Sequence, residues 1–226
     1  CVPETQVCLI QHRIRTLRDG RKVALAEKVH EFLDWAQRYF EISICSLGDQ
    51  PYVDMVVQVL DPSRNMIRGL TYSARGEYLH IQQTPYPKKP PKDLAAIYAF
   101  YNVDDVDKPS ISPIIIDDNI SMWPQCQQDN IIVVRESKPS PVWNVNLIPI
   151  QALLQSIHGE FFKQVDNWEL LDSESKLISR PVVVDCYKDL LRKDLSIRIA
   201  SNAGVFFDEE KEVELLFDSN GIPYNL

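Results

Sequence analysis

The sequence has no long apolar run, no block of five or more like charges and no closely spaced pair of cysteines. Its apolar runs are a few residues long, whereas about 18 residues are needed to cross a bilayer, so no membrane-spanning segment is expected. The stretch from Cys1 to Thr5 has neither the basic nor the apolar part of a signal peptide. These absences exclude a membrane protein and argue against secretion.

Clustered positive charge is missing as well, and the net charge is −8. Binding of duplex nucleic acid depends on groups of Lys and Arg that neutralise phosphates, so duplex nucleic acid is not an expected partner. The five cysteines form no CxxC pair and leave one unpaired, which suits a reducing compartment better than a disulfide framework. With 45% hydrophobic and 25% charged residues, the chain is predicted to be an intracellular globular protein.

Strand-like and helix-like segments alternate along the first sixty residues. Arg18–Arg21 is predicted to be a hairpin turn between strands at 7–16 and 22–25. Apolar residues then recur at helical spacing over 27–40 and 51–60, on either side of a short apolar strand at 42–45. Strand, helix and strand in this order predict a parallel, Rossmann-like α/β sheet flanked by helices.

Residues 61–91 break this pattern, since they contain two glycines and a proline-rich end, and they predict a β-ribbon insertion with a stiff connector. The remaining predicted elements are helices at 92–98 and 149–165, strands at 113–116 and 130–134, and β-like pieces at 181–184 and 196–199. We therefore predict an α/β domain over 1–170 and a C-terminal β-rich extension over 171–226, either separate or part of the same domain.

Two carboxylates, Asp117 and Asp118, follow the apolar run Ile114–Ile116 directly. Ligands of open α/β sheets bind beyond the carboxyl ends of the strands, so this run is predicted to be a buried parallel strand that delivers both carboxylates to a cleft. Paired carboxylates suit Mg²⁺. The hydroxyl of Ser46 and the ammonium of Lys92 suit phosphate. Taken singly, the residues also fit a helix cap, a turn and a solvated surface lysine.

The order of these segments resembles a known family. Several segments are similar to phosphatases of the RNA polymerase II C-terminal domain. They are residues 29–35, 39–48, 60–62, 92–94 and 114–118, followed by Trp123 and Pro124. That family belongs to the haloacid dehalogenase superfamily, and the aspartate pair followed by Trp-Pro resembles its branch associated with transcription factor IIF. The resemblance covers about residues 7–135.

The resemblance implies a role for each of four residues. Ser46 would be the phosphate-binding hydroxyl, Lys92 the phosphate-stabilising lysine, and Asp117 and Asp118 the acids of a metal site. The family's first strand ends in Asp-x-Asp-x-Thr or Val, in which the first Asp forms an aspartyl phosphate and the second is a general acid and base.

The corresponding place in this sequence holds Gln11 and Arg13. Gln11 cannot be an anionic nucleophile, and Arg13 stays protonated, so metal binding and turnover should both be lost. No cofactor is therefore expected, and Mg²⁺ would belong to an active form. Arg13 and Arg15 suit a metal-free anion pocket, because guanidinium forks match phosphate oxygens. Alternatively, both arginines point outward from a strand.

The sequence thus predicts a catalytically inactive, phosphatase-like domain. Its expected partner is a protein or phosphorylated peptide, and the resemblance points to the RNA polymerase II transcription machinery. A nuclear location is favoured over a cytoplasmic one. One alternative is an active Mg²⁺-dependent protein serine phosphatase that acts through an aspartyl phosphate on the polymerase C-terminal domain. Its nucleophile would then lie elsewhere or upstream in a longer parent, although the hairpin already occupies the place of the first strand. A structural subunit of a larger complex is the other alternative.

Overall fold

The computed structural model describes residues 10–83, 90–97, 113–134, 147–178, 180–201, 216–217 and 223–224. The chain divides into two compact units. Unit 1 contains residues 1–103, 119–127 and 136–151, and unit 2 contains residues 104–118, 128–135 and 152–226. Most of the predicted proline-rich connector lies outside the described residues.

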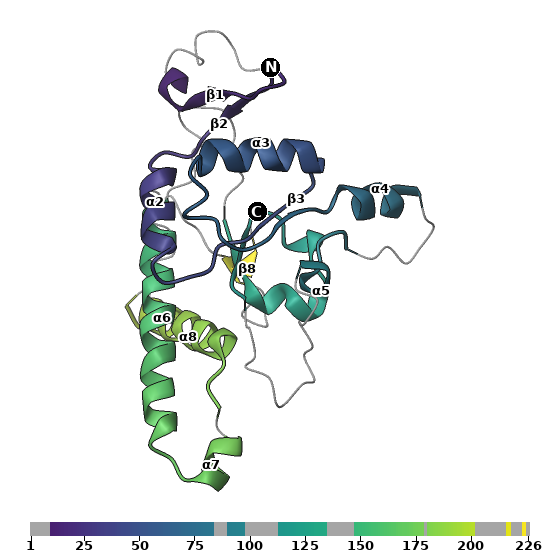
Figure 1. The fold of residues 1–226 in the computed structure, drawn as a ribbon. Helices are drawn as coiled ribbons and strands as arrows, with labels where there is room; N and C mark the ends of the chain where they lie inside the picture. The colour runs from purple at the N-terminus through teal and green to yellow at the C-terminus, as the bar shows by residue number, and fades with distance from the viewer. Residues whose placement is uncertain are drawn as a thin grey trace. The chain divides into compact units, whose positions relative to one another are not determined.

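Unit 1 begins with an antiparallel hairpin, drawn in purple in Figure 1. Strand β1 (Ile14–Thr16) pairs with β2 (Lys22–Ala24) around a turn in which Gly20 has a φ of 86°, so the predicted hairpin is confirmed. The predicted strand over 7–16 is shorter, because Gln11–Arg13 forms the 3₁₀ helix η1. Ile10 and Arg13 are both buried and lie three residues apart, which is the repeat of a 3₁₀ turn.

The predicted strand and two helices follow the hairpin (Figure 1). They are α2 (Val29–Ala36), β3 (Ile44–Ser46) and α3 (Gln50–Leu60). Helix α3 turns Val53 and Val57 inward, where they form a core with Ile67 that Ile42, Ile44 and Leu60 complete. Burial of such aliphatic side chains contributes about 1.5 to 3 kcal/mol each, so this core fixes α3 on β3.

The predicted β-ribbon at 61–91 is wrong. Strand β4 (Thr71–Ser73) pairs in parallel with β3, and Arg75–Gln83 forms helix α4. Gly69 does not mark a hairpin turn: its N–H donates to the Ile42 carbonyl, and a Cβ built on it would lie 2.1 Å from the Ser43 Oγ. The glycine therefore permits a close approach of two backbones at the start of a parallel pair.

Three further short helices lie within residues 90–97 and 119–130. Helix α5 covers Leu94–Ile97, and the 3₁₀ helices η2 and η3 cover Ile120–Met122 and Gln125–Asn130. The structure thus confirms a helix in the predicted 92–98 segment, with a start two residues later; Tyr98 lies outside the described residues.

Unit 2 contains the second parallel pair, β5 (Ile115–Asp117) and β6 (Ile131–Val133). Both predicted strands are therefore confirmed, and so is their parallel direction. Ile115 is buried whereas Ile116 is 41% exposed, so one face of β5 is covered rather than both. The predicted long helix is α6 (Leu147–Glu169), whose residues from 152 onward belong to this unit.

The described residues from 173 to 201 are mainly helical, which contradicts the predicted β-like pieces at 181–184 and 196–199. They form α7 (Ser173–Ile178) and α8 (Val183–Ser201), followed by one short antiparallel pair, β7 (Leu216–Phe217) with β8 (Pro223–Tyr224). Tertiary contacts override the β-branched run at 182–184.

Two buried side chains of α8 make those contacts. The Cys186 Sγ donates to the Gln164 Oε1 of α6, and the Tyr187 hydroxyl donates to the Ile131 carbonyl of β6, each over 3.3 Å. Burial raises the pKa of Tyr187 to about 12. Over the described residues, none of these helices combines the length and apolarity that a bilayer crossing requires.

Candidate phosphate site

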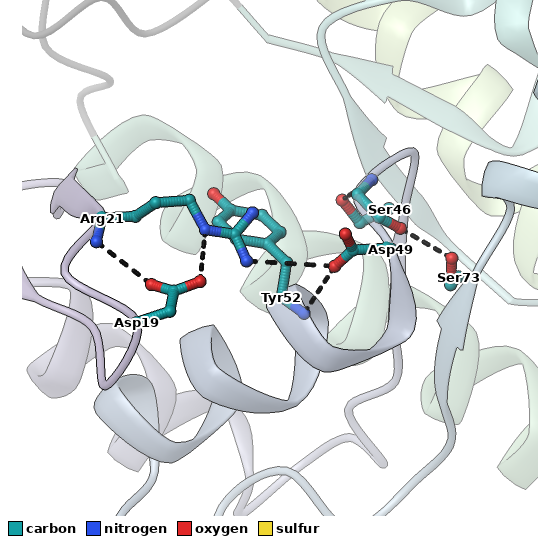
Figure 2. Close-up of polar contacts among 7 residues, drawn as sticks. Asp19, Arg21, Ser46, Asp49, Tyr52 and Ser73 are labelled. Atoms are coloured by element: carbon teal, nitrogen blue, oxygen red, sulfur yellow. Dashed lines mark hydrogen bonds and ion pairs between the residues drawn. The ribbon is translucent and has the colours of Figure 1, made fainter.

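Two serines mark the carboxyl ends of the parallel pair in unit 1. Ser46 ends β3, Ser73 ends β4, and the two are register partners, so their hydroxyls lie at one edge (Figure 2). The Ser46 Oγ accepts the Gly48 N–H over 3.1 Å, and the Ser73 Oγ donates to the Gly48 carbonyl over 2.6 Å. Since a hydroxyl can accept and donate at once, Ser46 can still donate to a phosphate oxygen.

The start of α3 lies beside these serines but is already capped. Asp49 is its N-cap and accepts the Tyr52 N–H over 2.8 Å. Gln50 joins α3 to β4, because its Oε1 accepts the Ser73 N–H over 3.0 Å. A carboxylate of the chain thus occupies the place that a bound anion would take at a helix N-terminus, which leaves phosphate recognition to side chains.

Arg21 of the hairpin reaches the same helix start (Figure 2). Its guanidinium lies 4.8 Å from the Tyr52 ring centroid, its Nε lies 2.5 Å from the Asp19 Oδ2, and its Nη2 lies 4.0 Å from the Asp49 Oδ1. The backbone N–H of Arg21 is the main group that lowers the pKa of Asp19. Arg21 therefore docks the hairpin onto α3.

Lys92, the predicted phosphate-stabilising lysine, is buried in unit 1 just before α5. Its backbone N–H donates to the Met122 carbonyl over 3.0 Å, and its ammonium lies 5.7 Å from the centroid of the Trp123 ring. The contact between this tryptophan and the lysine spans about thirty residues of chain, so no local sequence pattern predicts it.

Arg13 and Arg15, the predicted anion-binding arginines, differ in exposure. Arg15 is exposed, and its Nη1 donates to the carbonyls of His12 and Ile14. Arg13 is 7% exposed, and its Nε donates to the Leu25 carbonyl over 2.7 Å. The prediction that both arginines point outward is wrong for Arg13, because η1 turns its side chain inward.

The Nη2 of Arg13 is buried and has no hydrogen-bond partner in the described part of the chain. The indole Nε1 of Trp35 on α2 is a second buried donor of this kind. A buried guanidinium held by a single carbonyl is an uncompensated charge, which an anion would stabilise.

Asp117 and Asp118 belong to unit 2, whereas Ser46 and Lys92 belong to unit 1. Asp117 ends β5 and is 8% exposed, whereas Asp118 follows the strand and is exposed. Within the described ranges, no group of three His, Cys, Asp or Glu side chains is placed to hold a metal ion. Mg²⁺ needs only one or two carboxylates when water and phosphate complete its shell, so the aspartate pair still fits this ion.

The fold and these residues define the class of the protein. It is a mixed α/β protein with parallel strand pairs and helices, consistent with a haloacid dehalogenase-like fold. A family model described as NLI interacting factor-like phosphatase matches residues 6–166, so the chain belongs to that family. The predicted resemblance to phosphatases of the RNA polymerase II C-terminal domain is thereby confirmed.

A curated relative is also named as a phosphatase of the RNA polymerase II C-terminal domain type. The chain is 27% identical over 127 residues to "RNA polymerase II C-terminal domain phosphatase-like 3" of Arabidopsis thaliana. The aligned part covers 55% of this chain but 9% of the relative, so the chain corresponds to a small part of that protein. No solved structure matches the chain.

Proposed function

We propose that this chain is a phosphatase-like domain that binds a phosphorylated segment of a protein partner without hydrolysing it. Membership of a phosphatase family supports recognition of a phosphate group. The name of the Arabidopsis relative supports a partner in RNA polymerase II transcription and a nuclear location.

The observation that carries the proposal is the buried guanidinium of Arg13. Its side chain is 7% exposed, and its Nη2 is without a partner among the described residues. Desolvating an unpaired charge costs several kcal/mol, so such a group is retained at a cost in stability. A phosphate group suits it, because phosphate oxygens accept the forked donors of a guanidinium.

Ser46 and Lys92 support the same ligand. The Ser46 hydroxyl can donate while it accepts the Gly48 N–H, and Lys92 supplies a buried positive charge. If the alignment that the resemblance implies holds, Gln11 and Arg13 take the positions of the nucleophile and of the general acid and base. Neither side chain can form an acyl phosphate, which supports binding without turnover.

One observation favours the second candidate, an active Mg²⁺-dependent phosphatase. Gln11–Arg13 forms a 3₁₀ turn that leads into an antiparallel hairpin, whereas a nucleophile motif of this family should follow a parallel strand. These two residues therefore need not occupy the nucleophile's place. Asp117 and Asp118 would hold Mg²⁺, which supplies charge neutralisation on the phosphate when bound.

One experiment separates the candidates. The purified chain is mixed with a phosphoserine peptide and Mg²⁺, and both peptide binding and released phosphate are measured. We expect binding without phosphate release. Release that Asp117→Asn abolishes, while the exposed Asp34→Asn control does not, would establish the active enzyme instead. If the chain neither binds the peptide nor releases phosphate, both candidates are contradicted and a structural subunit is favoured.

A further inference from the structure

Lys92 is an ammonium group in an environment that should disfavour it. It is 9% exposed, and it precedes a helix of four residues, α5, which is too short to contribute an electrostatic site of its own. A buried lysine keeps a defined position only if neighbouring groups hold both its backbone and its charge.

Trp123 faces that charge. The Lys92 Nζ lies 5.7 Å from the centroid of the Trp123 ring, within the range of a cation–π interaction, and the ring is 3% exposed. Desolvation strengthens this attraction. A ring face also differs from a carboxylate, because it attracts the ammonium without neutralising its charge.

The backbone on either side of Lys92 is held by the segment that carries Trp123. The Lys92 N–H donates to the Met122 carbonyl over 3.0 Å. On the other side, Gln127 accepts the Leu94 N–H over 3.0 Å and donates to the Asp93 Oδ1 over 2.9 Å. These bonds fix the start of the lysine side chain, and the ring fixes its end.

Local bonds make this segment a firm support. Asn119 caps η2 by accepting the Ser121 N–H, and the Trp123 N–H donates to the Ile120 carbonyl. The Gln127 side chain is 6% exposed, so its amide bonds are shielded from water. A firm support is the condition for holding a charged group at one position.

We infer that Trp123 is a positioning residue for Lys92: its ring face, with the Met122 and Gln127 bonds on either side, places the ammonium to receive a phosphate oxygen. This inference rests on the proposed function, in which Lys92 binds the phosphate. If Trp123 only filled space, an aliphatic residue could replace it without loss of phosphate affinity. If its ring orients the ammonium, only an aromatic residue can replace it.

Binding of inorganic phosphate to the 226-residue chain tests the inference, with Trp123→Leu, Trp123→Phe and Lys92→Met as variants. Trp123→Leu should weaken binding about fivefold to thirtyfold, the range of a desolvated cation–π interaction, and Trp123→Phe should restore most of it. In the Lys92→Met background, Trp123→Leu should have no further effect. Trp168→Leu is the matched control, because Trp168 has a similar contact with Lys176, 5.6 Å from ring centroid to Nζ.

The possible results are distinct. Two results would overturn the inference while leaving the proposed function intact. One is unchanged phosphate binding in Trp123→Leu, and the other is weak binding in Trp123→Leu that Trp123→Phe does not restore. Unchanged binding in Lys92→Met would overturn the inference, because Lys92 would then not contact the phosphate. Absence of phosphate binding by the wild-type chain would instead overturn the proposed function. If Trp123→Leu does not fold, proton NMR of the wild-type chain decides: the Lys92 ε-methylene protons should be shifted upfield by the ring and should move on phosphate addition. Unshifted protons would overturn the inference.

Discussion

Two buried charged side chains in unit 1, Asp61 and Arg13, differ in how far hydrogen bonds compensate their charge. Asp61 is fully buried, and its carboxylate accepts the backbone N–H groups of Asn65, Met66 and Ile67 over 3.1, 2.8 and 2.8 Å. Arg13 is nearly as buried, yet its guanidinium makes one bond to a carbonyl and its Nη2 makes none to a described residue.

We interpret Asp61 as a structural charge and, in line with the proposed function, Arg13 as a charge that is retained for a ligand. Asp61 sits at the end of α3 and closes the loop that returns to β4, so its bonds stabilise the fold. An uncompensated buried charge instead lowers stability, and such groups persist where function requires them. The predictions below test this contrast, beginning with the largest expected effect.

Asp61→Ala should lower the free energy of unfolding by roughly 3 to 5 kcal/mol, because it leaves several buried N–H groups without an acceptor. Urea denaturation followed by circular dichroism measures the change. Asp54→Ala on the exposed face of α3 is the control and should stay within about 0.5 kcal/mol of wild type. A loss in Asp61→Ala no larger than in the control would mean that water replaces the carboxylate.

The contribution of Asp61 should also depend on pH. Burial alone would raise the pKa of this carboxyl, but the N–H groups of Ile67, Met66 and Asn65 outweigh it, and the pKa lies below its usual 3.8. The stabilisation is therefore complete above the unfolded-state pKa and is lost as the pH falls through the lower, folded-state pKa. Urea midpoints between about pH 7 and pH 2 should fall more steeply for wild type than for Asp61→Asn. Parallel curves would contradict this.

Arg13→Met should raise the free energy of unfolding by about 1 kcal/mol in buffer without phosphate, since it removes a desolvated charge and loses one bond to a carbonyl. Added phosphate should stabilise the wild-type chain but not this variant, because a ligand raises the free energy of unfolding only when it binds the folded state. A strong destabilisation by Arg13→Met would show that the guanidinium is compensated after all.

Arg15→Gln should change stability and phosphate binding least. The side chain is exposed and donates to the carbonyls of His12 and Ile14, and such contacts contribute at most about 0.5 kcal/mol. Thermal unfolding with and without phosphate measures both quantities. A loss of phosphate-dependent stabilisation as large as that of Arg13→Met would place Arg15 in the site and remove the contrast between the two arginines.

Much of the fold followed from local patterns. The helical spacing of Val53 and Val57 and the apolar run before Asp117 each correspond to an observed element. The parallel partner of β3 was missed, because Gly69 looks the same in a sequence whether it forms a turn or permits a close approach to Ile42. The β-branched run at 182–184 was misleading for a similar reason: distant contacts of Cys186 and Tyr187 determine that segment.

The site was predictable in its residue types but not in their surroundings. Ser46 and Lys92 were identified from order and spacing, and the structure places each of them near the end or start of an element. The opposite exposure of Arg13 and Arg15 depends on a single 3₁₀ turn, which a pattern of alternating residues cannot indicate. Likewise, Ser73 was missed because its strand was expected in a ribbon.

Calorimetric titration of a phosphoserine peptide into the wild-type chain and Arg13→Met, at matched ionic strength, tests the central claim most directly. Removal of a charge-assisted bond is worth about 1.5 to 3 kcal/mol, so the account predicts affinity weaker by about tenfold or more in Arg13→Met. Arg38→Gln, which removes an exposed arginine paired with Asp34, should bind as the wild type does. Equal affinities of wild type and Arg13→Met would contradict the account.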